Sequence, residues 1–144
     1  MGTRSLTHIQ NEHGTTLVTI YRQFDGYPSG MGQDLKDFLA PITLVNGIGQ
    51  HDRAGTHANG VGCLAAQLLK HLKEDIGGIY IKAPDSADCG EDYTYTVQVT
   101  DKKVIRLQVR GYKGKLLYDG PITAFDGATV EIDTLLTKVT KPEC

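Results

Sequence analysis

Hydrophobic and polar positions alternate with a period of two over several stretches of the chain, which predicts β-strands. Residues 3–22 are predicted to form a hairpin, because two runs rich in Thr and β-branched residues flank a central turn. A second hairpin is predicted for residues 93–110, around Asp101 and Lys102. The short run 79–81 predicts a buried strand, and residues 116–118 predict another. The inward face of the second hairpin is expected to hold Tyr93, Tyr95, Val97, Val99, Ile105, Leu107 and Val109.

Two segments follow the helical period instead. In residues 61–75 apolar side chains recur three and four positions apart, and Gly77 follows as a stop signal. A shorter helix is expected from Gln33 to Ala40, ended by Pro41. Residues 42–59 are expected to be mostly loop. The order of elements predicts the α+β class, with an antiparallel β-sheet of two hairpins plus added strands and two helices packed on one face.

The length of 144 residues fits a single domain, residues 1–144, and no linker or low-complexity stretch divides it. Seventeen glycines exceed the usual share of about 7% and predict several tight turns or close backbone approaches. The segment 23–32 is expected to lack regular structure, because it holds a proline and several glycines. The tail, residues 130–139, fits either a short helix or a strand.

The net charge is −2, with 15 basic and 17 acidic side chains well mixed along the chain. Binding to bulk nucleic acid needs a dense basic face, which is not evident here, whereas one or two arginines suffice for a small anion. The three cysteines form no disulfide framework. No apolar run reaches the length of a signal peptide or a membrane span. We therefore expect a cytoplasmic protein, in the host cytoplasm if it is viral, without a membrane partner or a cofactor.

No catalytic constellation is recognisable, so we do not expect an enzyme. The serines lie outside any G-x-S-x-G elbow. His51, Asp52 and His57 offer metal-ligand types in one loop but not at a known spacing, and no metal site is expected. A small metal-assisted phosphodiesterase built on these three residues stays an alternative. A protein-interaction or structural phage module, contacting its partner through exposed tyrosines, Arg106 and Arg110, is another.

The most specific pattern lies between the first hairpin and the first helix. A nucleobase needs a flat π-face and groups that read its edge, and a phosphate needs an arginine or free backbone N–H groups. Residues 21–30 supply all of these on a loop, and the hairpin brings the first strand beside them. The predicted ligand-binding residues are Arg4, Thr7, Tyr21, Arg22, Gln23, Asp25, Gly26, Tyr27, Ser29 and Gly30. The competing interpretation is a structural corner in which the tyrosines pack in the core and Arg22 pairs with Asp25.

These residues also carry a resemblance to a known family. Gly2-Thr3-Arg4-Ser5-Leu6-Thr7, then Tyr21-Arg22-Gln23 followed by Asp25-Gly26-Tyr27-Pro28, Gly30 and Gly32, resemble motifs of small proteins common in phages and bacteria. Less specific matches, such as Asn46-Gly47 and Glu91-Asp92-Tyr93, extend the resemblance to about residue 120. The family includes phage anti-defence sponge proteins, which capture the cyclic nucleotides that host immune systems use as signals, as in anti-CBASS evasion.

The resemblance implies a non-catalytic, homo-oligomeric protein that sequesters a small anionic ligand, a cyclic nucleotide. By this resemblance, the candidate ligand contacts are Arg4, Tyr21, Arg22, Gln23, Asp25 and Tyr27. The residue chemistry adds that Arg4 and Arg22 would meet phosphate charge and that a tyrosine would stack on a base. Gln23 and Asp25 would read the base edge. Sheet edges and a face left uncovered by two helices also favour a symmetric dimer or tetramer.

Overall fold

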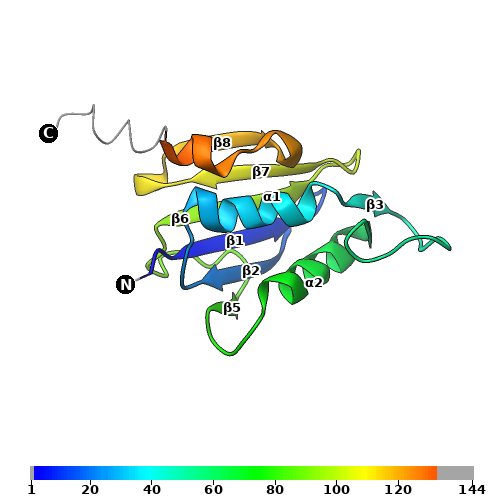
Figure 1. Cartoon of the computed structure of the whole chain (residues 1–144), viewed down its shortest axis with the longest axis horizontal. Helices are drawn as coiled ribbons and strands as arrows, with labels where there is room; N and C mark the ends of the chain where they lie inside the picture. The colour runs from blue at the N-terminus through cyan, green and yellow to red at the C-terminus, as the bar shows by residue number, and fades with distance from the viewer. Residues whose placement is uncertain (1, 133–144) are drawn as a thin grey trace, which may run out of the picture.

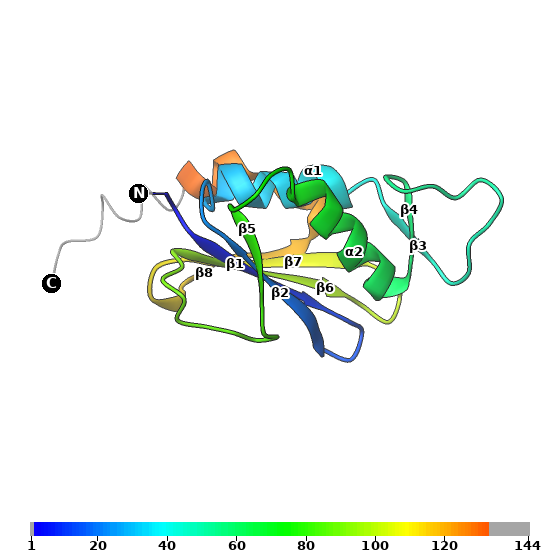
Figure 2. The same cartoon turned by 90° about the horizontal axis from the view of Figure 1, so that it is seen from below.

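The computed structural model describes residues 2–132, which form a six-stranded sheet with two helices on one face (Figures 1 and 2). The strand order across the sheet is β5-β2-β1-β6-β7-β8. The bounds of these elements are β1 Ser5–Gln10, β2 Thr16–Arg22, β5 Ile79–Lys82, β6 Tyr93–Val99, β7 Ile105–Arg110, β8 Leu116–Pro121, α1 Gln33–Leu39 and α2 Gly60–Leu72. The predicted α+β class, both hairpins and both helices are confirmed.

The sheet differs from the expected antiparallel arrangement at its centre. Its other four pairings are antiparallel, but β1 and β6 run parallel, with Ser5 opposite Tyr93 and Gln10 opposite Gln98. A hairpin fixes its own antiparallel pairing through a short turn. The pairing of β1 with β6 joins two separate hairpins through a long connection, so no local pattern sets its direction.

One hydrophobic core lies between the sheet and the helices. The predicted inward face of the second hairpin is confirmed, since Tyr95, Val97 and Leu107 are 0% exposed and Tyr93 packs against the same cluster. The α2 stripe is also buried, but the helix ends at Leu72 because Lys73 is already extended. The other side chains at the centre of this core include Ile9, Ile20, Met31, Leu35, Leu39, Leu64, Leu68 and Phe125.

One loop expectation is confirmed and another is corrected. The segment 42–59 is mostly loop, and it contains two short parallel strands, β3 Thr43–Val45 and β4 His57–Asn59, which pair only with each other. The segment 23–32 ends in a π-helical turn, Pro28–Gly32, that leads directly into α1. Proline fits the first position of this turn because the N–H that it lacks would have had no helical partner there. Most of the tail, residues 133–139, lies outside the described residues, and residues 127–132 are helical.

The strand β5 is confirmed as a strand but is not buried as expected. It forms an edge of the sheet, and its residues Tyr80 and Ile81 are 46% and 64% exposed. A three-residue hydrophobic run cannot reveal from sequence whether the strand lies at the centre or the edge of a sheet. The Nζ atom of Lys73 donates to the carbonyl oxygens of Gly77 and Ile79, at 3.0 and 2.9 Å. A lysine over outward-facing carbonyls discourages pairing with another strand.

Residues 83–92 connect β5 to β6 by crossing the sheet face opposite the helices (Figure 2). The backbone N–H of Asp85 donates to Oγ1 of Thr19 at 3.0 Å, and the hydroxyl of Thr16 donates to the Asp85 carboxylate. Oγ1 of Thr19 lies 2.8 Å from Nδ1 of His8. Because this oxygen already accepts from Asp85, its own hydrogen can donate to an unprotonated His8. The crossing segment thereby ties β1 and β2 together on the face without helices.

We expect His8 to make this contact sensitive to acid. Burial lowers the pKa of His8 below its usual 6.5, although the carboxylates of Asp85 and Glu91 act in the opposite direction. The unfolded chain then takes up a proton at a higher pH than the folded chain. Stability is therefore complete above the unfolded pKa and is lost as pH falls through it toward the folded pKa. Urea unfolding at about pH 7.5 and about pH 5.5 should show a larger loss for the native chain than for His8→Gln. Equal losses would contradict this role.

A second expectation concerns the hydroxyl of Thr7, which is 0% exposed and has no hydrogen-bond partner among residues 2–132. Thr7→Val keeps the shape of the side chain and removes the unpaired buried oxygen. We expect it to raise the free energy of unfolding by about 1 kcal/mol, measured by urea denaturation. A loss of similar size would mean that the hydroxyl has a partner that stabilises the fold.

Candidate functional site

Arg22, the last residue of β2, projects from the helix-covered face of the sheet. Its Nη1 atom donates to Oδ2 of Asp34 in α1 at 2.7 Å, and its Nε atom donates to the carbonyl oxygen of Phe24 at 2.7 Å. The Arg22 side chain is only 17% exposed. The expected partner of Arg22 in a structural corner was Asp25, but the structure pairs it with Asp34. This ion pair fixes the end of β2 against the first helix.

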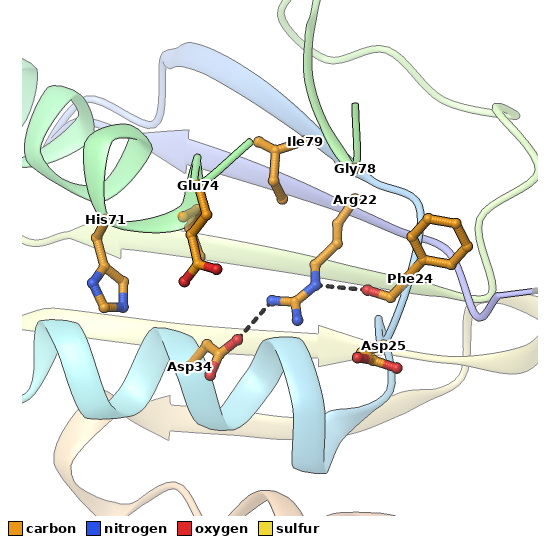
Figure 3. Close-up of a pocket in the computed structure, with 9 residues that line it drawn as sticks. Arg22, Phe24, Asp25, Asp34, His71, Glu74, Gly78 and Ile79 are labelled. Carbon is orange, nitrogen blue, oxygen red and sulfur yellow. Dashed lines mark hydrogen bonds and ion pairs between the residues drawn. The ribbon is translucent and has the colours of Figure 1, made fainter. Parts of the chain in front are cut away.

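The Arg22–Asp34 pair lies in an open hollow of about 330 Å³ (Figure 3). Three parts of the chain meet there: the segment after β2, α1, and the end of α2 with the turn into β5. Figure 3 shows the carboxylate of Glu74 and the ring of His71 on the side opposite Phe24 and Asp25. The residues that line the hollow are Arg22, Phe24, Asp25, Asp34, His71, Leu72, Glu74, Gly78 and Ile79.

The charges around this hollow favour a ligand group that donates hydrogen bonds. The carboxylates of Asp25, Asp34 and Glu74 face a single guanidinium, so carboxylates outnumber guanidinium groups in the hollow. A phosphate placed there would meet three like charges and an arginine that is already paired. Amino and imino groups of a planar base would instead find carboxylate acceptors. Phe24, which is 52% exposed, turns its carbonyl oxygen toward Arg22 and offers its aromatic ring at the rim of the hollow (Figure 3).

Phe24 lies in the predicted loop but was not among the predicted contacts. The side chains of Asp34, His71 and Glu74 were not predicted from the sequence either. They occupy or follow solvent-facing helix positions, which look alike in sequence whether they line a hollow or not. The ring of His71 stacks on Phe38 with centroids 4.5 Å apart. The sequence signal that places His71 and Glu74 near the sheet was the Gly77–Gly78 turn, which brings the end of α2 back to it.

Tyr21 does not join Arg22 in this hollow. Successive side chains of a strand point to opposite faces of the sheet, so the side chain of Tyr21 lies on the face without helices. Its ring centroid is 6.1 Å from that of Tyr80, and Nζ of Lys82 lies 5.4 Å from the Tyr21 ring centroid. Tyr21 and Arg22 are therefore placed for two different surfaces.

Arg4 and Thr7 of the first strand region also lie apart from the hollow. Thr7 is completely buried, so it cannot touch a ligand in this conformation. The backbone N–H of Arg4 donates to Oδ2 of Asp92 at 3.0 Å, and its carbonyl oxygen accepts from Asp92 N–H at 2.8 Å. The Arg4 side chain lies against Gly90, where an added Cβ would come within 2.8 Å of Nη1. Arg4 therefore faces the segment that crosses the sheet.

The remaining predicted residues form a tightly bonded corner. The N–H of Gly26 donates to the carbonyl of Thr3 at 2.9 Å, and the hydroxyl of Tyr95 donates to the carbonyl of Gly26 at 2.7 Å. Burial raises the pKa of Tyr95, so this hydroxyl stays a donor. Asp25 has a φ of 59°, and its carbonyl oxygen accepts from Met31 N–H at 2.8 Å. These contacts support the structural-corner interpretation for the backbone of this segment.

The side chains of that corner bond to one another rather than converge on one point. The hydroxyl of Tyr27 donates to Oδ1 of Asp25 at 3.1 Å, and this bond is the main cause of the raised pKa of Tyr27. The hydroxyl of Ser29 donates to the carboxylate of Glu131. Gln23 is held by its N–H, 2.8 Å from the carbonyl of Gly78, and an added Cβ at Gly30 would lie 2.2 Å from the carbonyl of Asp25. Of the predicted set, the structure brings Arg22 and Asp25 to the hollow.

The loop considered for metal-assisted chemistry contains one matching contact. Nε2 of His57 lies 3.5 Å from Oδ1 of Asp52, and Nδ1 of His57 lies 2.9 Å from the hydroxyl of Thr56. His51 lies in the same loop but makes no hydrogen bond or ion pair with Asp52 or His57. Within residues 2–132 no three or more His, Cys, Asp or Glu side chains are grouped closely enough to hold a metal ion.

Comparisons with protein-family models, with curated proteins and with solved structures found no match. In the part of the chain that the structure describes, no helix has the length and apolar character needed to span a membrane.

The tight corner makes a stability prediction that contrasts Gly26 with an exposed glycine of α2. An added Cβ at Gly26 would lie 2.8 Å from the backbone carbon of Arg4, so Gly26→Ala should lower the free energy of unfolding by about 1–3 kcal/mol. Gly62, which is exposed in the first turn of α2, has open space around its Cβ position. Gly62→Ala should stabilise by about 0.5–1 kcal/mol. Denaturant unfolding of both variants tests this contrast. If Gly26→Ala leaves the free energy of unfolding unchanged, the close packing of the corner is refuted.

Proposed function

We propose that this protein binds a nucleotide without converting it, with the base in the Arg22 hollow. The observation that carries the proposal is the meeting of Arg22, Phe24 and Asp25 with Glu74 and Asp34 in one hollow. A volume of about 330 Å³ lies at the lower end of the range for small-molecule sites, which suits one base with its sugar.

The lining residues divide the contacts to a base. Phe24 supplies the stacking face, and such stacking contributes about 1–3 kcal/mol per base. The carboxylates of Asp25 and Glu74 accept from the amino and imino groups of the base edge. The Nη2 atom of Arg22, which has no partner among the described residues, donates to a ring nitrogen or a carbonyl oxygen of the base. The phosphates then point out of the acidic hollow.

The identity of the ligand as a cyclic nucleotide immune signal rests on the resemblance of the GTRSLT and YRQFDGYP motifs to phage sponge proteins. In that role the protein lowers the concentration of the signal by holding it. It acts as a homo-oligomer, a dimer or tetramer, in the host cytoplasm. Releasing the ligand unchanged is part of this proposal, since sequestration needs no bond to be broken.

The proposal is tested by calorimetry with cyclic dinucleotides, cyclic trinucleotides and cyclic ADP-ribose isomers. We expect at least one to bind at micromolar concentration or tighter. Phe24→Leu and Glu74→Gln should each weaken that ligand by about 10-fold, because each removes an interaction worth about 1.4 kcal/mol. Asp101→Asn, in the distant turn between β6 and β7, is the matched control and should bind normally.

Three outcomes separate the parts of the proposal. If no member of the panel binds at micromolar protein, nucleotide binding is refuted. If a ligand binds but both variants at the hollow bind it normally, the function stands and the position of the base is wrong. If mass spectrometry of the ligand released after denaturation finds a changed mass, the protein is an enzyme.

A further inference from the structure

The hairpin of β7 and β8 concentrates positive charge in an acidic chain. The hairpin, residues 105–121, contains four Lys and Arg side chains and one carboxylate, Asp119, whereas the whole chain has a net charge of −2. Asp119 pairs with Arg106, and the other three basic side chains lie at one tip of the hairpin, where β7 ends and β8 begins: Arg110, Lys113 and Lys115. The field at this tip therefore favours an anion.

Tyr112 stands at the same tip, outside the hydrophobic core. It is 69% exposed, and Nζ of Lys113 lies 5.4 Å from its ring centroid. Lys113 holds a φ of 54°, a left-handed backbone conformation that residues with a Cβ seldom adopt. Such conformations cluster at ligand-binding positions. An aromatic face that is left open beside lysines suits a ligand that joins a planar ring to a negative group.

The guanidinium of Arg110 is already fixed at the tip. Its Nη1 atom donates to the carbonyl oxygen of Gly114 at 3.0 Å, and its Nε atom donates to Oε1 of Gln108 at 3.3 Å. These neutral acceptors leave its charge uncompensated, and its Nη2 atom has no partner among residues 2–132. Arg22, by contrast, is paired with the carboxylate of Asp34. A phosphate would therefore meet a more favourable arginine at the tip than in the hollow.

The tip and the Arg22 hollow are separate places at the same end of the sheet. Ser5 pairs with both Arg22 and Tyr93, and Thr94 pairs with Arg110, so β1 and β6 lie between the two arginines. The backbones of Arg22 and Arg110 are three strand spacings apart, which is about 14 Å. Figure 1 shows the start of β1 and the β7–β8 turn at this end of the molecule. A ligand at the tip does not need the hollow.

We propose that residues 110–116 form a second binding site, for a phosphate-bearing ligand with a planar ring, such as a nucleoside diphosphate. Tyr112 stacks on the ring, and Arg110 and Lys115 pair with the phosphates. This site goes beyond the proposed function, and it can exist whether or not a base occupies the Arg22 hollow.

The test is a titration of the ¹⁵N-labelled full-length protein with ADP, adenosine and pyrophosphate, followed by amide chemical shifts. We expect ADP to shift the amides of residues 110–116 and to bind at least about 10-fold more tightly than adenosine or pyrophosphate, because it uses both contacts. Tyr112→Ala should reduce ADP to the affinity of pyrophosphate. Lys115→Glu should weaken ADP and pyrophosphate about 10-fold and leave adenosine unchanged.

The matched control is Lys102→Glu, which makes the same charge change at the opposite end of β7. If it weakens ADP as much as Lys115→Glu does, the effect comes from overall charge and the site is refuted. Binding of ADP no tighter than pyrophosphate, or shifts confined to the Arg22 hollow, would also overturn the proposal. Amide spectra that are unaltered away from each substitution verify that each variant is folded.

Discussion

The parallel pairing of β1 with β6 joins the two halves of the sheet. Each hairpin can form its own hydrogen bonds, but an isolated hairpin is at best marginally stable in water. The β1–β6 pairing places Ile9 beside Val97 and Thr7 beside Tyr95, all of them buried. This contact turns two local hairpins into one sheet with a single core. It also depends on contacts between residues far apart in sequence, so loop closure must precede it.

The direction of that pairing explains two other features. The chain leaves β2, forms both helices on one face, and returns as β5 on the outer side of β2. To reach β6 it must then cross β2 and β1 on the opposite face, and residues 83–92 make that crossing. The bonds from Asp85 to Thr16 and Thr19 hold the crossing in place. The Tyr95 hydroxyl, from β6, bonds to Gly26 on the other face and so places the segment beside Arg22.

Local patterns in the sequence predict the hairpins, the helices and the inward faces, because each depends on residues near one another. The parallel centre and the exposure of β5 depend on which strands become neighbours, and periodicity does not contain that information. For the site, strand alternation alone separates Tyr21 from Arg22, since adjacent residues cannot share a face. The composition of residues 21–30 predicted that Tyr21 and Arg22 share one loop surface. The alternation of side chains along β2 instead places them on opposite faces of the sheet. Asp34 and Glu74 could not be found, because their approach to Arg22 depends on how the helices pack.

The charge distribution places a constraint on any nucleotide that this protein binds. Carboxylates that accept from a base edge also repel its phosphates, so one small hollow cannot favour both parts. Arg22 does not resolve this conflict, because Asp34 already neutralises it. Among the described residues, Arg110, Lys113 and Lys115 carry positive charge with no ion pair, and they lie together two intervening strands away. Contacts at such an exposed tip weaken as salt screens them, whereas stacking on Phe24 does not. The salt dependence of affinity therefore distinguishes a ligand held through its phosphates from one held through its base.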